Sequence, residues 1–302
     1  MKNQNRPRIL KSVIRICVIW IIALTPSISW AFGPGGHMIV AKIAYDRLNP
    51  KAKAQADKLL AILIDPANTT KKDKDFVNAS HWPDDLRSIA QEPLKSKFAP
   101  TFSLHFIDRP FSTDGTRLPG VPTPNIVTAL NDNVKILKTS TDPKAQAQAL
   151  RFIIHFVGDI HQPLHCATRV DKTHPSGDRG GNDLFIDNPA KELHRYWDGG
   201  IGSFPKAGAN FAPPSLSAIP PAVAKVKLGN PDTDPALKLN APFAFQNWAN
   251  ESLAMAKVTA YDSLKNKDKP SAAYNAKALS AVRKRAAWAG YRLAALLNAI
   301  WH

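Results

Sequence analysis

The sequence predicts an all-α or mainly α protein built as a single domain. Apolar residues recur at helical spacing through most of the chain, and the patterns that favour strands are short. Two His-x-x-x-Asp pairs, His155 with Asp159 and His194 with Asp198, add a chemical signal. Because positions i and i+4 share one face of a helix, the side chains of each pair can reach one metal ion. The predicted fold therefore carries its chemistry on helix faces and at helix ends.

The first 31 residues have the pattern of a secretory signal peptide. Five basic residues and no acidic one precede the apolar core Ile16–Leu24, which at about nine residues is too short to span a bilayer. Cleavage after Ala31 would leave one domain over residues 32–302, secreted or periplasmic and without a membrane anchor. Two alternatives stay open. The segment could remain as an uncleaved anchor, or cleavage two residues earlier could expose Trp30 instead of Phe32.

Helices dominate the first half of this domain. Apolar residues at helical spacing predict them over Gly36–Leu48, Pro50–Ile64, Asn125–Leu137 and Pro143–Ile160. The last of these carries the first His–Asp pair, and Pro163 ends or kinks it. Between the helices, the short stretch Ser103–Ile107 is predicted to be extended.

The second half alternates turns with helices. Thr168–Pro189 is rich in Gly and Pro and predicts a loop or a small β-hairpin, with Gly180-Gly181-Asn182 as a turn into a short strand. Lys191–Trp197 predicts a short helix that Gly199-Gly200 stops. Ile201–Pro242, rich in Pro and Ala, predicts an irregular surface excursion. Two closing helices are predicted over Phe243–Leu264 and Ser271–Trp301.

Charge and cysteine usage narrow the class of protein. The net charge is +16, and it falls to +11 when the five basic residues of the leader are removed. An exported protein this cationic attracts polyanions such as nucleic acid or acidic membrane surfaces. Cys17 leaves with the leader, so the mature chain keeps only Cys166 and forms no internal disulfide. Cys166 follows His165, and a thiolate ligand competes there with a small packed thiol.

The grouping of histidines is the strongest chemical signal. Three of the nine histidines, His155, His161 and His165, fall within eleven residues of one another beside Asp159. Imidazole and carboxylate with little sulfur form a zinc-type ligand set.

Two further segments carry candidate ligands. His37 follows a Gly-Pro-Gly-Gly run in which glycine permits a tight fold-back, so the new amine of Phe32 can share a metal with it. The competing interpretation of that run is a frayed terminus. Asp84, which follows Trp82-Pro83, can equally be a helix N-cap.

Taken in order, these motifs resemble the S1/P1 nuclease family, whose members are secreted trinuclear zinc enzymes with the helical fold of zinc phospholipase C. The resemblance covers essentially the whole mature chain, and its specificity comes from the combination of segments. The matching segments are Phe32-x4-His37, Trp82-Pro83-Asp84, Leu104–Asp108, His155–His165, Gly180-Gly181-Asn182, His194-x3-Asp198, Trp248–Ser252 and Arg292–Asn298.

This resemblance implies three zinc ions per chain. The first would be bound by Asp84, His105, His155 and Asp159. The second would be bound by the main-chain amine and carbonyl of Phe32, by His37, and by Asp159 as a bridge. The third would be bound by His165, His194 and Asp198. Family members usually begin with Trp rather than Phe, but the ligands there are main-chain atoms, so the change should be tolerated.

The resemblance also implies the reaction, hydrolysis of single-stranded DNA or RNA to 5′-phosphate products with accompanying 3′-nucleotidase activity by a monomer. Asp84 and Asp159 would hold the catalytic metals, and Arg87 would bind the phosphate. Phe106 would stack on a base and Asp108 would hydrogen-bond to its edge. Simpler roles compete: a solvated arginine, a core phenylalanine, and an acid that orients His105.

Two other classes of function remain as alternatives. A zinc phospholipase C typically has a longer gap from its N-terminal residue to the first histidine and a final His-x-x-x-Glu pair. Here the gap is five residues and the final pair ends in Asp198, which favours the nuclease. A non-catalytic, metal-free protein that binds nucleic acid is the second alternative, and the filled ligand positions argue against it.

Overall fold

The computed structural model describes residues 32–64, 75–86, 94–208 and 212–302. Within these ranges helices dominate, and the only sheet has two strands. The predicted leader and Arg87 lie outside the described residues. None of the described helices combines the length and apolar character needed to cross a bilayer. The helices are α1 Pro34–Tyr45, α2 Pro50–Leu60, α3 Trp82–Asp85, α4 Leu94–Phe98, α5 Ile126–Thr139, α6 Pro143–His161, α7 Leu193–Asp198, α8 Ile219–Lys227, α9 Phe245–Met255 and α10 Ala272–Ile300. The strands are β1 Pro110–Ser112 and β2 Thr168–Val170.

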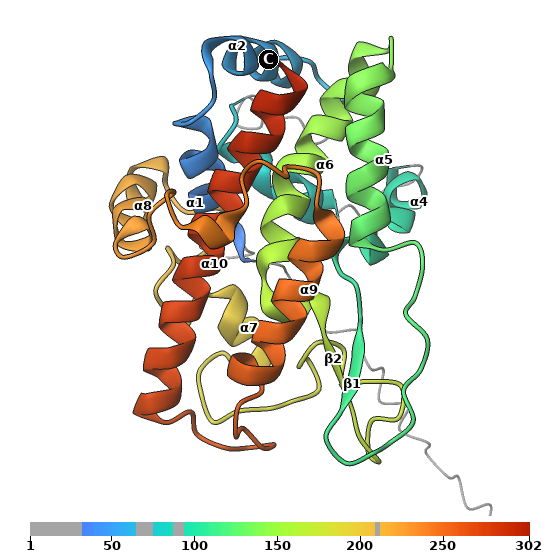
Figure 1. The fold of residues 1–302 in the computed structure, drawn as a ribbon, viewed down its shortest axis with the longest axis vertical. Coiled ribbons are helices and arrows are strands. Elements are labelled where there is room, and N and C mark those ends of the chain that lie inside the picture. The colour runs from blue at the N-terminus through green and yellow to red at the C-terminus, as the bar shows by residue number, and fades with distance from the viewer. Residues whose placement is uncertain (1–31, 65–74, 87–93, 209–211) are drawn as a thin grey trace, which may run out of the picture.

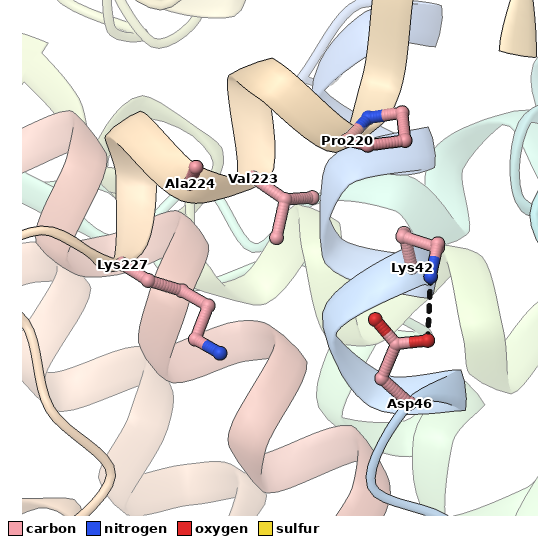
Figure 2. A pocket seen from close by; sticks show the side chains of 6 residues that line it. All are labelled: Lys42, Asp46, Pro220, Val223, Ala224 and Lys227. Atoms are coloured by element: carbon pink, nitrogen blue, oxygen red, sulfur yellow. Dashed lines mark hydrogen bonds and ion pairs between the residues drawn. The ribbon is translucent and has the colours of Figure 1, made fainter. Parts of the chain in front are cut away.

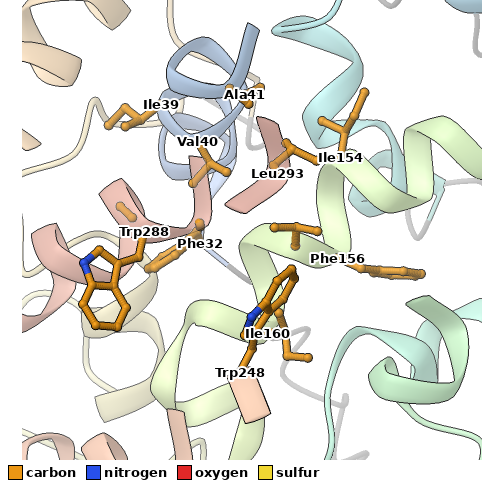
Figure 3. Close-up of a cluster of buried hydrophobic side chains, with 14 of the residues drawn as sticks. Phe32, Ile39, Val40, Ala41, Ile154, Phe156, Ile160, Trp248, Trp288 and Leu293 are labelled. Carbon is orange, nitrogen blue, oxygen red and sulfur yellow. The ribbon is translucent and has the colours of Figure 1, made fainter. Parts of the chain in front are cut away.

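The core lies where α1, α6, α9 and α10 meet. Helix α10 runs along the molecule beside α1 and α6, and α5 packs on the outer side of α6 (Figure 1). Figure 3 shows side chains from these helices closing around Phe32, which is completely buried. Each such large apolar side chain contributes about 1.5–3 kcal/mol when it leaves water. Phe32 is therefore part of the core, and the segment that begins with it is not frayed.

Helix boundaries follow local capping chemistry. Asn125 caps α5 in a reciprocal capping box with Thr128, and Ser271 caps α10 by accepting a hydrogen bond from the backbone N–H of Tyr274. Asp142 caps α6, where Pro143 takes the first helical position. Pro163 then stops α6 as the sequence predicts, and a 3-10 turn over Pro163–Cys166 follows.

The Pro- and Ala-rich segment Ile201–Pro242 is not wholly irregular, contrary to the sequence-based prediction. It contains α8, which packs against α1 and α10. Ile219, Val223 and Val226 lie on one buried face of α8, and its two prolines sit in the first turn, where missing N–H groups cost nothing. The high Pro and Ala content of the segment therefore made a short amphipathic helix look irregular in the sequence.

The small β element also differs from the predicted hairpin. β1 and β2 pair in parallel, with Phe111 opposite Arg169, so a long connection must join them. One isolated antiparallel bridge joins Phe185, within the predicted segment, to Glu192, which lies beyond its end. The predicted turn at Gly180-Gly181-Asn182 is confirmed, with left-handed backbone angles at Arg179, Gly180 and Gly181.

Two further expectations are corrected. Ser103–Ile107 is not extended, because a 3-10 turn spans Ala99–His105 and the chain becomes extended only from Phe106. Helix α7 begins at Leu193, not Lys191, because Lys191 has a φ of 66° that no right-handed helix accepts.

A hollow of about 260 Å³ lies on the surface between α1 and α8. Figure 2 shows Lys42 and Lys227 at its rim, with Lys42 paired to Asp46 over 2.5 Å. None of the candidate metal ligands lines this hollow, so it is separate from the candidate metal centre.

Candidate metal centre

The fold brings eight predicted ligand side chains into three adjoining groups. Within each group the possible ligand atoms lie within 4.8 Å of one another. The groups are His37 with His155 and Asp159, Asp84 with His105 and His155, and His165 with His194 and Asp198. The first two share His155 and form what we call the inner pocket, made of His37, Asp84, His105, His155 and Asp159. The third group is the outer pocket.

The inner pocket is built around the polar stripe of α6. All its side chains are at most 1% exposed. Oδ2 of Asp159 lies 3.0 Å from Nδ1 of His105 and 3.1 Å from Nε2 of His155. Oδ1 of the same carboxylate lies 3.2 Å from Nε2 of His37 without hydrogen-bond geometry. Asp159 thus presents each oxygen to a different set of histidines.

His37 reaches this pocket because α1 and α6 approach closely. Its ring stacks on that of His155 with centroids 3.8 Å apart. A Cβ at Gly158 would lie 2.8 Å from Nδ1 of His37, so only glycine leaves room for the ring. The Gly-Pro-Gly-Gly run serves packing and not the predicted left-handed fold-back. Gly35 and Gly36 are helical, and a Cβ at Gly36 would lie 2.7 Å from Cβ of Phe32.

Burial and charge set the protonation of the inner pocket. Burial, reinforced by His155, lowers the pKa of His37 to about 3, so this ring is neutral with a lone pair available. Burial opposes the charge of His155, but the carboxylates of Asp159 and Asp84 outweigh it and raise the pKa of His155. Burial likewise opposes ionisation of Asp159, yet His155 and the hydrogen bonds of the surrounding rings lower its pKa.

The outer pocket lies just beyond the C-terminal end of α6. His165 comes from the 3-10 turn after α6, while His194 and Asp198 occupy one face of α7. Nε2 of His165 lies 3.1 Å from Nε2 of His194, and Oδ2 of Asp198 lies 3.5 Å from the latter. The backbone N–H of Gly33 donates to the carbonyl of Asp198 over 3.0 Å, which ties the segment before α1 to this pocket.

The opposed imidazoles show that a cation fits here. Nδ1 of His165 lies 2.8 Å from the carbonyl oxygen of His105, and Nδ1 of His194 lies 2.7 Å from that of Gly180. A carbonyl oxygen only accepts, so Nδ1 carries the proton in each neutral ring. The two Nε2 lone pairs therefore face each other, an arrangement that a bound cation stabilises. His155 also bonds a carbonyl through Nδ1, that of Ser80, which turns its Nε2 toward Oδ2 of Asp159 at 3.1 Å.

The predicted substrate residues follow His105 directly. Phe106 is half-buried and extended, and its carbonyl caps the start of α5 by accepting from Ile126. Burial, and then the charge of Asp178, raise the pKa of Asp108 to about 6 against the opposing pull of Arg179. Asp108 thus senses the charges of Asp178 and Arg179, the residues just before Gly180.

Cys166 is a packed thiol, as one of the two sequence interpretations held. Its Sγ contacts the carbonyl of Ile160 at 3.4 Å, and burial raises its pKa to about 12. Such a thiol stays protonated and inert.

Sequence reasoning missed three supports of the centre. Gly158 needed knowledge of how α1 crosses α6, and Gln162, which donates to Asp198, needed the position of α7. The third support is a buried charge network: Arg292 donates to Nε2 of His161, and Glu251 accepts from both Arg292 and Arg285. The one available signal was the pair of arginines seven residues apart on an otherwise apolar helix face.

Comparison with known proteins gives a consistent picture. The family model described as S1/P1 Nuclease matches residues 32–302. Endonuclease 3 of Arabidopsis thaliana is 29% identical over 95% of this chain and 96% of its own length. Endonuclease 5 of the same plant is 26% identical over 95% of this chain and 97% of its own. Nuclease P1 of Penicillium citrinum is 28% identical over 55% of this chain and 57% of its own.

Proposed function

The chain belongs to the S1/P1 nuclease family, and from that membership we propose that it is an exported zinc-dependent endonuclease of single-stranded DNA and RNA. It leaves 5′-phosphate and 3′-hydroxyl ends and also acts as a 3′-nucleotidase. The observation that carries the proposal is the convergence of eight buried imidazole and carboxylate side chains into three groups. Nitrogen and oxygen ligands of this kind favour zinc.

Asp159 is the central residue of the proposed inner pocket. Its two oxygens face different histidines, as a bridge between two metal ions requires. Asp84 adds a second buried carboxylate, with Oδ1 3.6 Å from Nδ1 of His105. When bound, paired zinc ions would supply charge neutralisation on the phosphate and a lowered pKa for water. His37 stays neutral here and leaves its lone pair for binding, because burial holds its pKa low.

The remaining roles concern the substrate. Phe106 stacks on an unpaired base, which is worth about 1–3 kcal/mol and requires a strand that is not already stacked in a duplex. Asp108 hydrogen-bonds to the edge of that base. Arg87 binds the phosphate, since a planar guanidinium matches its oxygens. The outer pocket of His165, His194 and Asp198 would hold a third zinc, which would neutralise charge on the leaving oxygen.

The proposed mature protein begins at Phe32, spans 32–302, and acts as a monomer in the periplasm or outside the cell. Phe32 is completely buried and its ring lies 5.6 Å from that of Phe204, edge to face. Its amine would complete the second zinc site with its carbonyl and His37. Edman sequencing of the secreted protein tests this start against the alternative at Trp30.

The function is tested with the purified secreted protein. Zymograms on single-stranded DNA, duplex DNA and egg-yolk lipid separate the nuclease from the phospholipase, while elemental analysis counts bound zinc. We expect cleavage of single-stranded DNA, loss of activity in EDTA, and about three zinc ions per chain. Lipid clearing without DNA cleavage, or full activity after exhaustive chelation, would overturn the proposal.

A further inference from the structure

We propose that Gln162 is the positioning residue of the outer pocket: it holds one oxygen of Asp198 and so leaves the other to bind metal. This inference rests on the proposed function, because it concerns the affinity of a metal site. Gln162 itself is completely buried and lies at the position that ends α6. It is not one of the predicted ligands.

The orientation of the Gln162 amide is fixed by its two partners. Its Oε1 accepts from the backbone N–H of Leu164 over 2.6 Å. A backbone N–H can only donate, so oxygen must occupy that end of the amide and nitrogen the other. Nε2 therefore donates to Oδ1 of Asp198, over 2.7 Å. Both ends of the side chain are engaged, and it has no second arrangement that keeps both bonds.

The bond from Gln162 makes the carboxylate of Asp198 unlike that of Asp159. Oδ1 of Asp198 receives the amide proton and lies 3.9 Å from Nε2 of His165, while Oδ2 faces His194. In Asp159 both oxygens face histidines. A carboxylate with one oxygen held by a neutral donor is suited to bind a single ion through the other. Asp198 should bind in that way, whereas Asp159 can bridge.

The backbone that carries Gln162 is itself held in place. Nε of Arg285 donates to the carbonyl of His161 over 3.0 Å, and Oγ of Ser252 donates to that of Ile160 over 2.6 Å. Arg285 is anchored in turn by Glu251 at 2.9 Å. These bonds fix the backbone from which the amide of Gln162 reaches Asp198. A group that orients a metal ligand needs such a fixed position.

The test compares Gln162→Met with Gln146→Met, the same substitution near the start of α6, where the side chain bonds only the carbonyl of Leu137. Metal-free protein is titrated with zinc against a chromophoric chelator, and each variant is also melted. Loss of an outer-shell partner typically weakens metal binding about 10–100-fold. We expect that loss for one zinc of three in Gln162→Met, with the other two unchanged, and no change in Gln146→Met.

A second pair of variants identifies the affected site. His194→Ala removes an outer-pocket ligand, so adding Gln162→Met to it should weaken no further zinc. If Gln162→Met does not fold, Gln162→Glu keeps the shape but turns the donor into an acceptor, and should weaken the same ion more strongly. Equal weakening of all three ions, or wild-type affinity in both variants, would refute the positioning role. Wild-type protein that binds no zinc would instead refute the proposed function.

Discussion

The inner and outer pockets use the same side-chain types in different settings. The inner pocket takes His37, His155 and Asp159 from the long helices α1 and α6, and its residues are at most 1% exposed. Its Asp159 carboxylate is shared between two sets of histidines. The outer pocket is built from a 3-10 turn, a glycine turn and the six-residue helix α7. Its Asp198 is 5% exposed, and one oxygen of that carboxylate accepts a hydrogen bond from Gln162.

The difference indicates a division of labour. Long packed helices hold ligands with little freedom, which suits a metal pair whose spacing must stay fixed. The turns and the short helix leave the ligands of the outer pocket slightly more exposed than those of the inner pocket. A hydrogen bond from Gln162 then supplies the orientation that a short helix cannot supply alone. The inner pocket should therefore be the tighter and the outer pocket the more easily emptied.

The largest effect should follow from Asp159→Asn. Removing the shared charge should disrupt two sites at once. Since a metal supplies several kcal/mol of charge stabilisation and 1.36 kcal/mol is a factor of ten in rate, kcat/KM should fall about 10³-fold or more. The assay is cleavage of a single-stranded oligonucleotide. Asp142→Asn is the matched control, because Asn caps α6 as well as Asp does. If the variant keeps a tenth of the wild-type activity, Asp159 does not have the central role proposed here.

Stepwise chelation should separate the two pockets directly. A site held at 1,000 times its Kd contributes about 4 kcal/mol to folding stability. We expect one zinc to leave first with a small fall in Tm, and the remaining two to leave together with a larger fall. The measurement is zinc content against Tm over a series of chelator strengths. Simultaneous loss of all three ions would mean that the pockets do not differ in affinity.

Sequence patterns predict the candidate ligands of both pockets better than the residues that support them, for a physical reason. His155 and Asp159 are four residues apart on one helix, so local geometry alone brings them together. His194 and Asp198 follow the same rule. Gln162, however, meets Asp198 only because α7 folds back onto the end of α6, and no local pattern encodes that contact.

The fold shows the same division between local and tertiary information. Apolar periodicity predicted α5, α6 and α10 within a few residues, because helical spacing is local, as are caps such as Asn125. Helix α8 was missed because Pro and Ala hid its apolar face, and β1 was missed because its partner β2 lies far along the chain. Parallel pairing leaves no turn signal in the sequence.

Gly158→Ala should damage the inner pocket selectively. The new Cβ would lie 2.8 Å from Nδ1 of His37 and push the ring aside. A ligand displaced by about 1 Å can cost about 100-fold in rate, and overpacking costs about 1–3 kcal/mol of stability. Gly290→Ala is the control, since its Cβ would meet Cβ of Ile43 at 2.5 Å where α10 crosses α1. Both variants should melt earlier, but only Gly158→Ala should bind the inner zinc ions more weakly. Equal zinc affinity in the two would show that His37 adjusts freely.

The smallest predicted effect concerns Asp108, a carboxyl on the outer-pocket side that lacks the ring of histidines around Asp159. Its pKa is raised to about 6, chiefly by burial, from an ordinary value of 3.8. The Asp108 carboxyl therefore ionises at lower pH in the unfolded chain than in the folded protein. As the pH rises from about 4 to about 6, the folded protein loses stability.

The substitution Asp108→Asn removes that loss. The metal-free variant should exceed wild type by at most about 3 kcal/mol above pH 6, because one pKa unit is worth about 1.36 kcal/mol, and should match it near pH 4. Urea unfolding across this pH range measures the difference, with the exposed carboxyl of Asp187 changed to Asn as the control. A gain that grows toward low pH would mean that Asp108 is stabilised in its charged form, as Asp159 is, and the contrast between the two carboxylates would disappear.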